Sequence, residues 1–125
     1  MYKPSDGARR ALEGGWCLQA VGDAQRSIRL VLGDTELAHA NIGLVIGRHP
    51  ALCDRTIDDL TISHRHCRFS VREGQLLVED LNSLNGTLID GQTLPSFDPV
   101  PVAERKTLML GRLALAVTRL GGEQG

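Results

Sequence analysis

The chain has 125 residues, of which 42% are hydrophobic and 23% charged, and its formal net charge at pH 7 is −1. This length suits one domain with a core large enough to fold without disulfides or metal. The near-zero charge argues against general nucleic-acid binding, because such proteins carry a basic excess that displaces counterions from phosphates. No apolar run approaches the roughly 18 residues that a membrane-spanning helix needs, so we expect no membrane insertion.

The two ends of the chain are polar and weakly patterned. Residues 1–15 lack the continuous apolar stretch of a secretory signal, so we expect a cytoplasmic protein. We predict a flexible tail over 1–14 with one helical turn near 8–12, a single folded domain over 15–121, and a flexible C-terminus over 122–125.

Cysteine and arginine usage add to this picture. An odd number of cysteines without regular spacing is no disulfide framework, and we expect free thiols at Cys17, Cys53 and Cys67. Of the 14 basic residues, 12 are arginine, a composition compatible with a GC-rich bacterial source.

Short apolar stretches recur through the domain. Turn signals separate them at intervals of roughly 8–12 residues, which favours an all-β sandwich or barrel. Each stretch is too short for a free-standing helix. The sequence therefore predicts strands at 16–21, 27–32, 43–46, 66–71, 76–79, 87–89, 107–110 and 113–120.

The turns and alternation within these stretches support the prediction. In 27–32 and 113–120 large apolar residues alternate with smaller or polar ones, although the Leu/Ala composition of 113–120 would also suit a helix. Glu73-Gly74 and Asp90-Gly91 predict hairpin turns, because glycine accepts the positive φ of primed turns. We predict a loop over the 90s, because three of the seven residues at 95–101 are prolines.

Positive charge is concentrated in one segment of this near-neutral chain. Between Arg48 and Arg72 there are five arginines and three histidines, against three aspartates. The planar arginine fork holds a phosphate through two parallel hydrogen bonds. The segment therefore indicates a phosphate site.

Three polar clusters lie at predicted strand ends or in loops, where binding residues usually lie on a rigid scaffold. They are Gly47-Arg48, the run Asp59-Leu-Thr-Ile-Ser-His-Arg-His66, and the run Asp80-Leu-Asn-Ser-Leu-Asn-Gly-Thr87. Gly-Arg, then Ser-x-x-His, then Asp-Leu-x-Ser-x-Asn-Gly-Thr, in this order, resembles the forkhead-associated (FHA) domain family, over about residues 16–120. The resemblance implies a β-sandwich of two antiparallel-rich sheets with about eleven strands, whose loops at one end recognise phosphothreonine.

Phosphothreonine carries about −1.5 to −2 charges and three acceptor oxygens, so its pocket needs a cation and hydroxyl or backbone donors. By the resemblance, Arg48 is that cation, Ser63 donates its hydroxyl, and Asn85 bonds the peptide main chain. Each residue also has a structural interpretation: a solvated arginine at a strand end, a serine of a turn, and an asparagine of an Asn-Gly turn.

Three further residues are expected at the rim of the site. His64 stands where the family commonly has arginine, and Arg65 follows it, so both add charge. We expect binding to weaken above about pH 7 as His64 loses its proton, partly opposed by the dianionic phosphate that forms above about pH 6. Leu84 offers an apolar wall to the threonine methyl or to a downstream side chain. Arg55 departs from the aliphatic residue usual in the family.

Four other motif residues match family positions that support the loops. We expect His66 to hold its loop through a buried hydrogen bond and Gly86 to take the turn conformation. The supporting set is Gly47, His66, Gly86 and Thr87.

Two other site chemistries can be written for these residues. A zinc site would combine His64, His66, Cys67 and Cys53, but on a strand His64 and His66 face opposite to Cys67, and no paired zinc motif is present. A cysteine nucleophile could pair with His49 or His66, but no nucleophile elbow or nucleotide loop accompanies it. We expect no enzymatic activity, no metal and no cofactor.

The sequence thus predicts a phosphothreonine-dependent adaptor in Ser/Thr kinase signalling. Its partners would be a phosphothreonine-containing protein and, upstream, the Ser/Thr protein kinase that modifies it. The alternative is a degenerate FHA domain that binds proteins without phosphate through a face of its sandwich.

Overall fold

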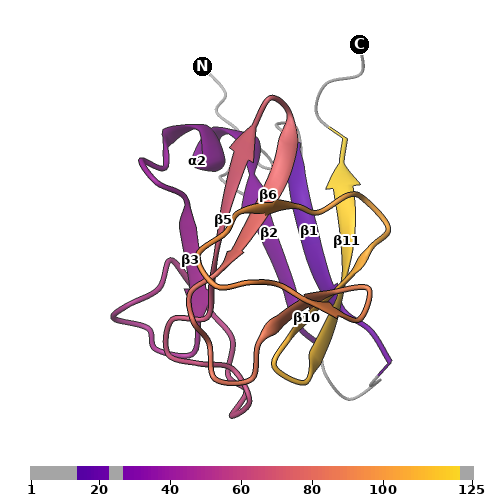
Figure 1. Ribbon diagram of the computed structural model, residues 1–125. Helices are drawn as coiled ribbons and strands as arrows, with labels where there is room; N and C mark the ends of the chain where they lie inside the picture. The colour runs from indigo at the N-terminus through magenta and orange to yellow at the C-terminus, as the bar shows by residue number, and fades with distance from the viewer. Residues whose placement is uncertain (1–13, 23–26, 122–125) are drawn as a thin grey trace.

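The computed structural model describes residues 14–22 and 27–121. Residues 1–13 and 122–125, where we predict the two flexible ends and the helical turn, lie outside the described residues. In the described part, eleven strands form two sheets with a single short helix, which confirms the predicted all-β fold (Figure 1).

Each sheet is built from segments far apart in the sequence. The six-stranded sheet has the order β2 (Arg29–Gly33), β1 (Gly15–Ala20), β11 (Leu113–Leu120), β10 (Thr107–Leu110), β7 (Thr87–Ile89) and β8 (Gln92–Thr93). The five-stranded sheet has the order β4 (Arg55–Thr56), β3 (Leu44–Gly47), β5 (Cys67–Arg72), β6 (Gln75–Asp80) and β9 (Val100–Pro101). Strands β3 and β4 pair in parallel, and the other paired strands are antiparallel.

The core lies between the two sheets and follows the predicted alternation. In β11 the side chains of Leu113, Leu115 and Val117 are buried, while the residues between them are more exposed, which confirms a strand rather than a helix. Phe69 and Ile46 on the facing sheet are fully buried. Burying one such side chain contributes roughly 1.5–3 kcal/mol, so the core holds the strand ends, and the loops attached to them, in fixed positions.

All eight predicted strands are present, but four elements were missing from the prediction. Strands β4, β8 and β9 have two residues each, and the last two lie in the region predicted as a loop, so that prediction was partly wrong. The helix α2 (Asp34–His39) follows β2 directly. Asp34 and Glu36 place negative charge in its first turn, and Leu37 buries its side chain in the core.

Both predicted hairpin turns are confirmed. Glu73 and Gly74 have φ values of 52° and 77°, and Asp90 and Gly91 have 47° and 85°, as primed turns require. Figure 1 shows α2 at one end of the sandwich and the loops that connect β3 to β4, β4 to β5 and β6 to β7 at the opposite end. The three polar clusters lie on those loops.

Candidate functional site

Three loops meet at the end of the sandwich opposite α2 (Figure 1). They line one depression of about 370 Å³. The six residues predicted to contact a ligand all lie in its wall: Arg48, Ser63, His64, Arg65, Leu84 and Asn85. Leu60, Thr61 and Ile62 complete the wall and are not among the predicted contacts.

Arg48 follows β3 and is fixed at its base. Its backbone N–H donates to the Ser63 carbonyl at 2.9 Å, and its Nε donates to the Ile62 carbonyl at 3.1 Å. The two terminal nitrogens of the guanidinium make no bond within the described chain and can both donate to a ligand. The preceding Gly47 lets the loops approach this closely, because a Cβ there would overlap the carbonyl oxygen of His64.

Ser63 is held by a buried imidazole. The Ser63 N–H donates to Nδ1 of His66 at 3.0 Å, so His66 carries its proton on Nε2 and donates it to the Gly86 carbonyl at 2.9 Å. Burial lowers the pKa of His66, against the opposing effects of that carbonyl and of Asp80. His66 is fully buried. It therefore joins two of the three loops as a neutral side chain.

The third loop contributes Asn85 and Leu84. Asn85 Nδ2 donates to the Thr61 carbonyl at 2.9 Å, which leaves Oδ1 and one amide hydrogen for another partner. Gly86 has a φ of 90°, while Asn85 keeps a negative φ, so Gly86 takes the left-handed conformation of this turn. Leu84 is 88% exposed, and its N–H donates to Ser63 Oγ at 2.9 Å.

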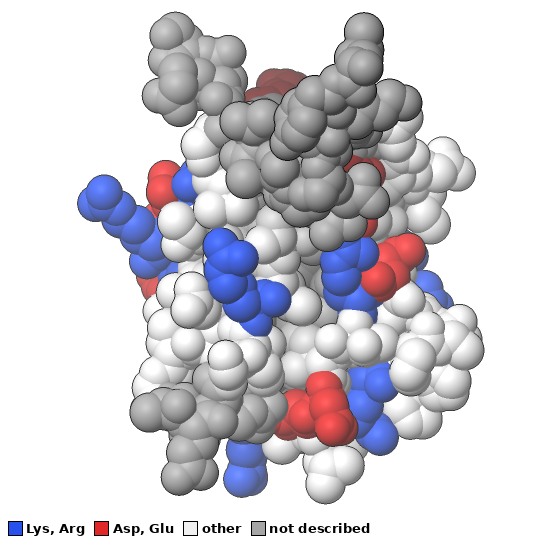
Figure 2. Space-filling view, turned by 180° about the vertical axis from the view of Figure 1, so that it is seen from behind, with Lys and Arg blue, Asp and Glu red and all other residues white. Residues whose placement is uncertain are grey.

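The depression carries positive charge and no acid in its wall. Neither Arg48 nor Arg65 forms an ion pair with a carboxylate in the described part of the chain. By contrast, Arg55 lies outside the wall and pairs with Glu36 of α2, so it adds no open charge to the site. On the face seen from behind, basic and acidic residues are interspersed (Figure 2).

A family model of the FHA domain matches residues 44–111, a span that contains all three loops. The chain belongs to the FHA domain family. The predicted family membership is therefore confirmed.

Similar proteins include two bacterial regulators. The chain is 36% identical over 69 residues to the oxoglutarate dehydrogenase inhibitor of Corynebacterium efficiens, covering 51% of this chain and 48% of that protein. It is 35% identical over 69 residues to the glycogen accumulation regulator GarA of Mycolicibacterium smegmatis, covering 55% and 41%. The chain thus spans less than half the length of these relatives.

Solved structures agree on the fold. One of them comes from a structural and functional analysis of phosphothreonine-dependent FHA domain interactions. It matches this chain with a TM-score of 0.62 and 22% sequence identity, over 83% of this chain and 95% of that one.

In this FHA domain, Asp80 is the centre of a network that the sequence reasoning missed. Its side chain accepts hydrogen bonds from Ser83 Oγ at 2.6 Å and Thr87 Oγ1 at 2.7 Å. Burial opposes its ionisation, but these bonds lower the pKa of Asp80 below its ordinary value. Ser83 Oγ in turn accepts from the Gly86 N–H at 3.0 Å. The sequence signal for this network is the spacing: Ser83 follows Asp80 by three positions, and Thr87 follows it by seven.

Thr61, within the Asp59–His66 run, is the second feature missed, and its contacts fix the middle loop. Its hydroxyl donates to Asp59 Oδ1 at 2.6 Å and accepts from the Arg112 N–H at 3.0 Å. Gly111 allows this approach, since a Cβ there would lie 2.7 Å from the Thr61 hydroxyl oxygen. The β10–β11 turn therefore buttresses the FHA depression.

The cysteine and zinc alternatives find little support in this FHA domain. Burial raises the pKa of Cys53 and raises that of Cys67 well above its ordinary value, and a nucleophile or metal ligand must be a thiolate. Among residues 14–22 and 27–121, no group of three or more His, Cys, Asp or Glu side chains is placed to hold a metal ion. No helix among those residues is long and apolar enough to cross a membrane.

Proposed function

We propose that this FHA domain binds phosphothreonine in partner proteins and acts as an adaptor without enzymatic activity. The observation that carries the proposal is the convergence of six predicted residues, from three loops, on one cationic depression without an acid in its wall. An upstream Ser/Thr protein kinase would supply the phosphate, and we place this recognition in the cytoplasm.

The donors at the depression match the chemistry of a phosphate. Ser63 Oγ already accepts the Leu84 N–H, so its own hydrogen is free to donate. Arg48 uses only Nε within the chain and keeps its terminal nitrogens for two parallel bonds to phosphate oxygens. Charge-assisted bonds of this kind are about twice as strong as neutral ones. We assign phosphate contact to Arg48 and Ser63.

Asn85 matches the chemistry of an extended peptide main chain. Its bond to the Thr61 carbonyl orients the amide and leaves one acceptor and one donor. A peptide unit beside the phosphorylated residue offers the complementary pair. We assign this contact to Asn85 and rim contacts to His64, Arg65 and Leu84.

The relatives that the chain partly matches are named as an enzyme inhibitor and a metabolic regulator. We carry over the class of action alone: control of a partner through binding.

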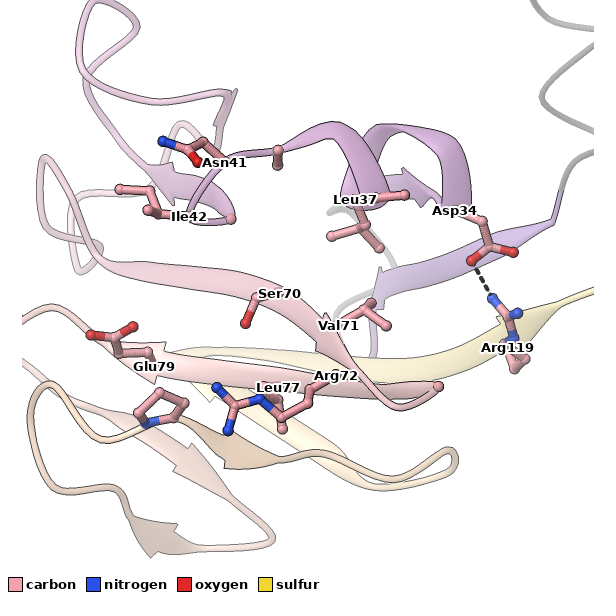
Figure 3. Close-up of a pocket in the computed structure, with 15 residues that line it drawn as sticks. Asp34, Leu37, Asn41, Ile42, Ser70, Val71, Arg72, Leu77, Glu79 and Arg119 are labelled. Carbon is pink, nitrogen blue, oxygen red and sulfur yellow. Dashed lines mark hydrogen bonds and ion pairs between the residues drawn. The ribbon is translucent and has the colours of Figure 1, made fainter.

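A groove at the α2 end of the sandwich favours a second candidate, phosphate-independent protein binding. It has a volume of about 700 Å³ and lies between the α2–β3 connection and the β5–β6 hairpin (Figure 3). Ile42, 64% exposed, and Val71 give it apolar walls, while Arg72 adds a cation.

The test is capture of a degenerate peptide library centred on phosphothreonine, compared with phosphoserine and unmodified threonine. Arg48→Ala removes the proposed phosphate cation, and Arg72→Ala is the matched control, an exposed arginine of the other groove. Phosphothreonine-selective capture that is lost in Arg48→Ala and kept in Arg72→Ala supports the proposal. Absence of selectivity in the wild type overturns it, and partner binding that is lost in Ile42→Asp would then assign the second candidate.

A further inference from the structure

Two histidines lie side by side at the loop end of the sandwich: His64, which lines the depression, and His49, which lies next to it outside the wall. Their ring centroids are 5.3 Å apart and the ring planes meet at 70°, an edge-to-face arrangement. Two backbone hydrogen bonds set this arrangement: Arg48 N–H to the Ser63 carbonyl at 2.9 Å and His49 N–H to the His64 carbonyl at 3.2 Å. The pair is therefore built by the same contacts that build the site.

The two imidazoles are not equivalent. Nδ1 of His49 accepts the Ala51 N–H at 3.2 Å and is therefore engaged within its own loop. His64 lines the depression and is exposed, and its ring nitrogens bond to no residue in the described chain. His64 is thus free to bond a ligand in the depression, while His49 already makes a bond within its own loop.

The charges around His64 come from two loops. Arg48, Cys53 and Asp54 lie on the loop after β3, and Arg65 follows His64 on its own loop. The Cys53 thiol donates to the His64 carbonyl at 2.9 Å, and Asp54 Oδ2 accepts the Val45 N–H. Arg48 and Arg65 make this part of the wall positive. A phosphate dianion in the depression reverses that balance.

We propose that phosphopeptide binding here takes up one proton on His64, and that His49 is a positioning residue that holds His64 for it. The proposal rests on the proposed function, because it needs phosphate in this depression. The proton comes from the solvent: neutral His64 and the dianionic phosphopeptide combine with H⁺ to give an imidazolium–phosphate pair. The His49 ring packs edge-to-face against that imidazolium.

The sign of the pH dependence follows from this coupling. Bound phosphate favours the charged imidazole, so the extra affinity is complete where His64 is already protonated in the free domain. It is lost as the pH rises through the titration of His64 in the complex. A site with arginine alone shows the opposite trend below about pH 7, because its affinity grows as the phosphate second proton leaves near pH 6. Affinity therefore has a maximum near neutral pH.

The experiment is calorimetric titration of one phosphothreonine peptide into the domain, in two buffers of different ionisation enthalpy, at about pH 6.5, 7.5 and 8.5. We expect the affinity to fall several-fold between the first and last pH, because the added contact needs a protonated His64. The buffer dependence should give net proton uptake at pH 7.5. His64→Arg should bind at all three pH values without uptake, and His39→Gln, a distant exposed histidine on α2, should behave as wild type.

Two variants test the role of His49. His49→Phe keeps the aromatic face and cannot take a proton, so uptake should persist; its loss would place the proton on His49 and overturn the assignment. His49→Ala should weaken binding at pH 6.5 and leave it nearly unchanged at pH 8.5, whereas equal weakening at both would mean a merely structural role. Binding without uptake in the wild type overturns this inference alone. Absence of binding in the wild type and in His64→Arg overturns the proposed function as well.

Discussion

Arg48 and Arg119 lie at opposite ends of the sandwich and are used in opposite ways. Arg119 donates to Asp34 Oδ1 at 2.7 Å and lies 5.0 Å from the centroid of the Trp16 ring, next to the groove of Figure 3. Arg48 has no carboxylate partner in the described chain and presents its terminal nitrogens to the depression. Arginine thus stabilises the fold at one end, as Arg119, and keeps its terminal nitrogens unpaired in the described chain at the other, as Arg48.

Two glycines at strand ends show a parallel difference. Gly33 ends β2 next to α2, and a Cβ there would meet only Glu36 Cβ at 3.9 Å. Gly47 ends β3 at the depression, and a Cβ there would overlap the His64 carbonyl oxygen and lie 2.9 Å from Cys53 Sγ. Close backbone approach is therefore required at Gly47 and not at Gly33.

The largest expected effect tests this contrast between the two glycines. Gly47→Ala should lower the free energy of unfolding by about 1–3 kcal/mol, because the methyl group forces two backbone segments apart. It should also weaken phosphopeptide binding, since Arg48 and Ser63 bond across that contact. Urea unfolding and calorimetric titration measure the two effects.

Gly33→Ala is the control. Its methyl group has space, and the change should cost less than about 1 kcal/mol, the usual range for a helix N-cap substitution. Equal destabilisation by the two substitutions would contradict the contrast.

The next effect sharpens the contrast between the arginines. Arg119→Ala should lower the free energy of unfolding by about 1–2 kcal/mol, the sum of a cation–π contact and a half-exposed ion pair. It should leave phosphopeptide affinity unchanged. Arg48→Ala should do the reverse, changing stability by under about 0.5 kcal/mol. A stability loss in Arg48→Ala as large as in Arg119→Ala would mean that Arg48 is structural.

The strands were predictable where a pattern was long enough to repeat. β11, with eight residues, is long enough for its alternation to be recognised. The pairs Glu73-Gly74 and Asp90-Gly91 indicate the two hairpin turns. β4, β8 and β9 have two residues each, too few for any period, and owe their conformation to the neighbours they pair with. The helix α2 did leave a local signal in Asp34 and Glu36, before the buried Leu37.

That the motif residues line one depression could be predicted, because each has chemistry suited to a ligand contact. Their buttresses could not be predicted. Thr61 is fixed by Arg112, 51 positions later, and no local pattern reports such a contact. Asp80 belongs to the third polar cluster, but it was assigned no role from the sequence. Its partners Ser83 and Thr87 come within hydrogen-bond distance only when the loop folds over it.

The smallest expected effect concerns acid and compares Asp80 with Asp90. Asp80 is 3% exposed, and although burial opposes its ionisation, hydrogen bonds from Ser83 and Thr87 lower its pKa. A carboxylate whose pKa is lower in the folded state than in the unfolded state stabilises the fold at pH values above the unfolded-state pKa. That stability is lost as the pH falls below about 4 toward the folded pKa. Asp80→Asn should therefore lower stability at pH 7 and flatten its decline between about pH 5 and pH 2, measured by urea unfolding.

Asp90, in the exposed β7–β8 turn, is the comparison for this prediction. The Thr107 N–H and Lys106 lower its pKa too, so acid weakens both carboxylates in the same direction. Water can replace the partners of Asp90 but not those of buried Asp80, whose protonation disturbs the loop that carries Leu84 and Asn85. Asp90→Asn should therefore flatten the acid decline less than Asp80→Asn. Equal flattening would assign the acid sensitivity to the hairpin as much as to the binding end.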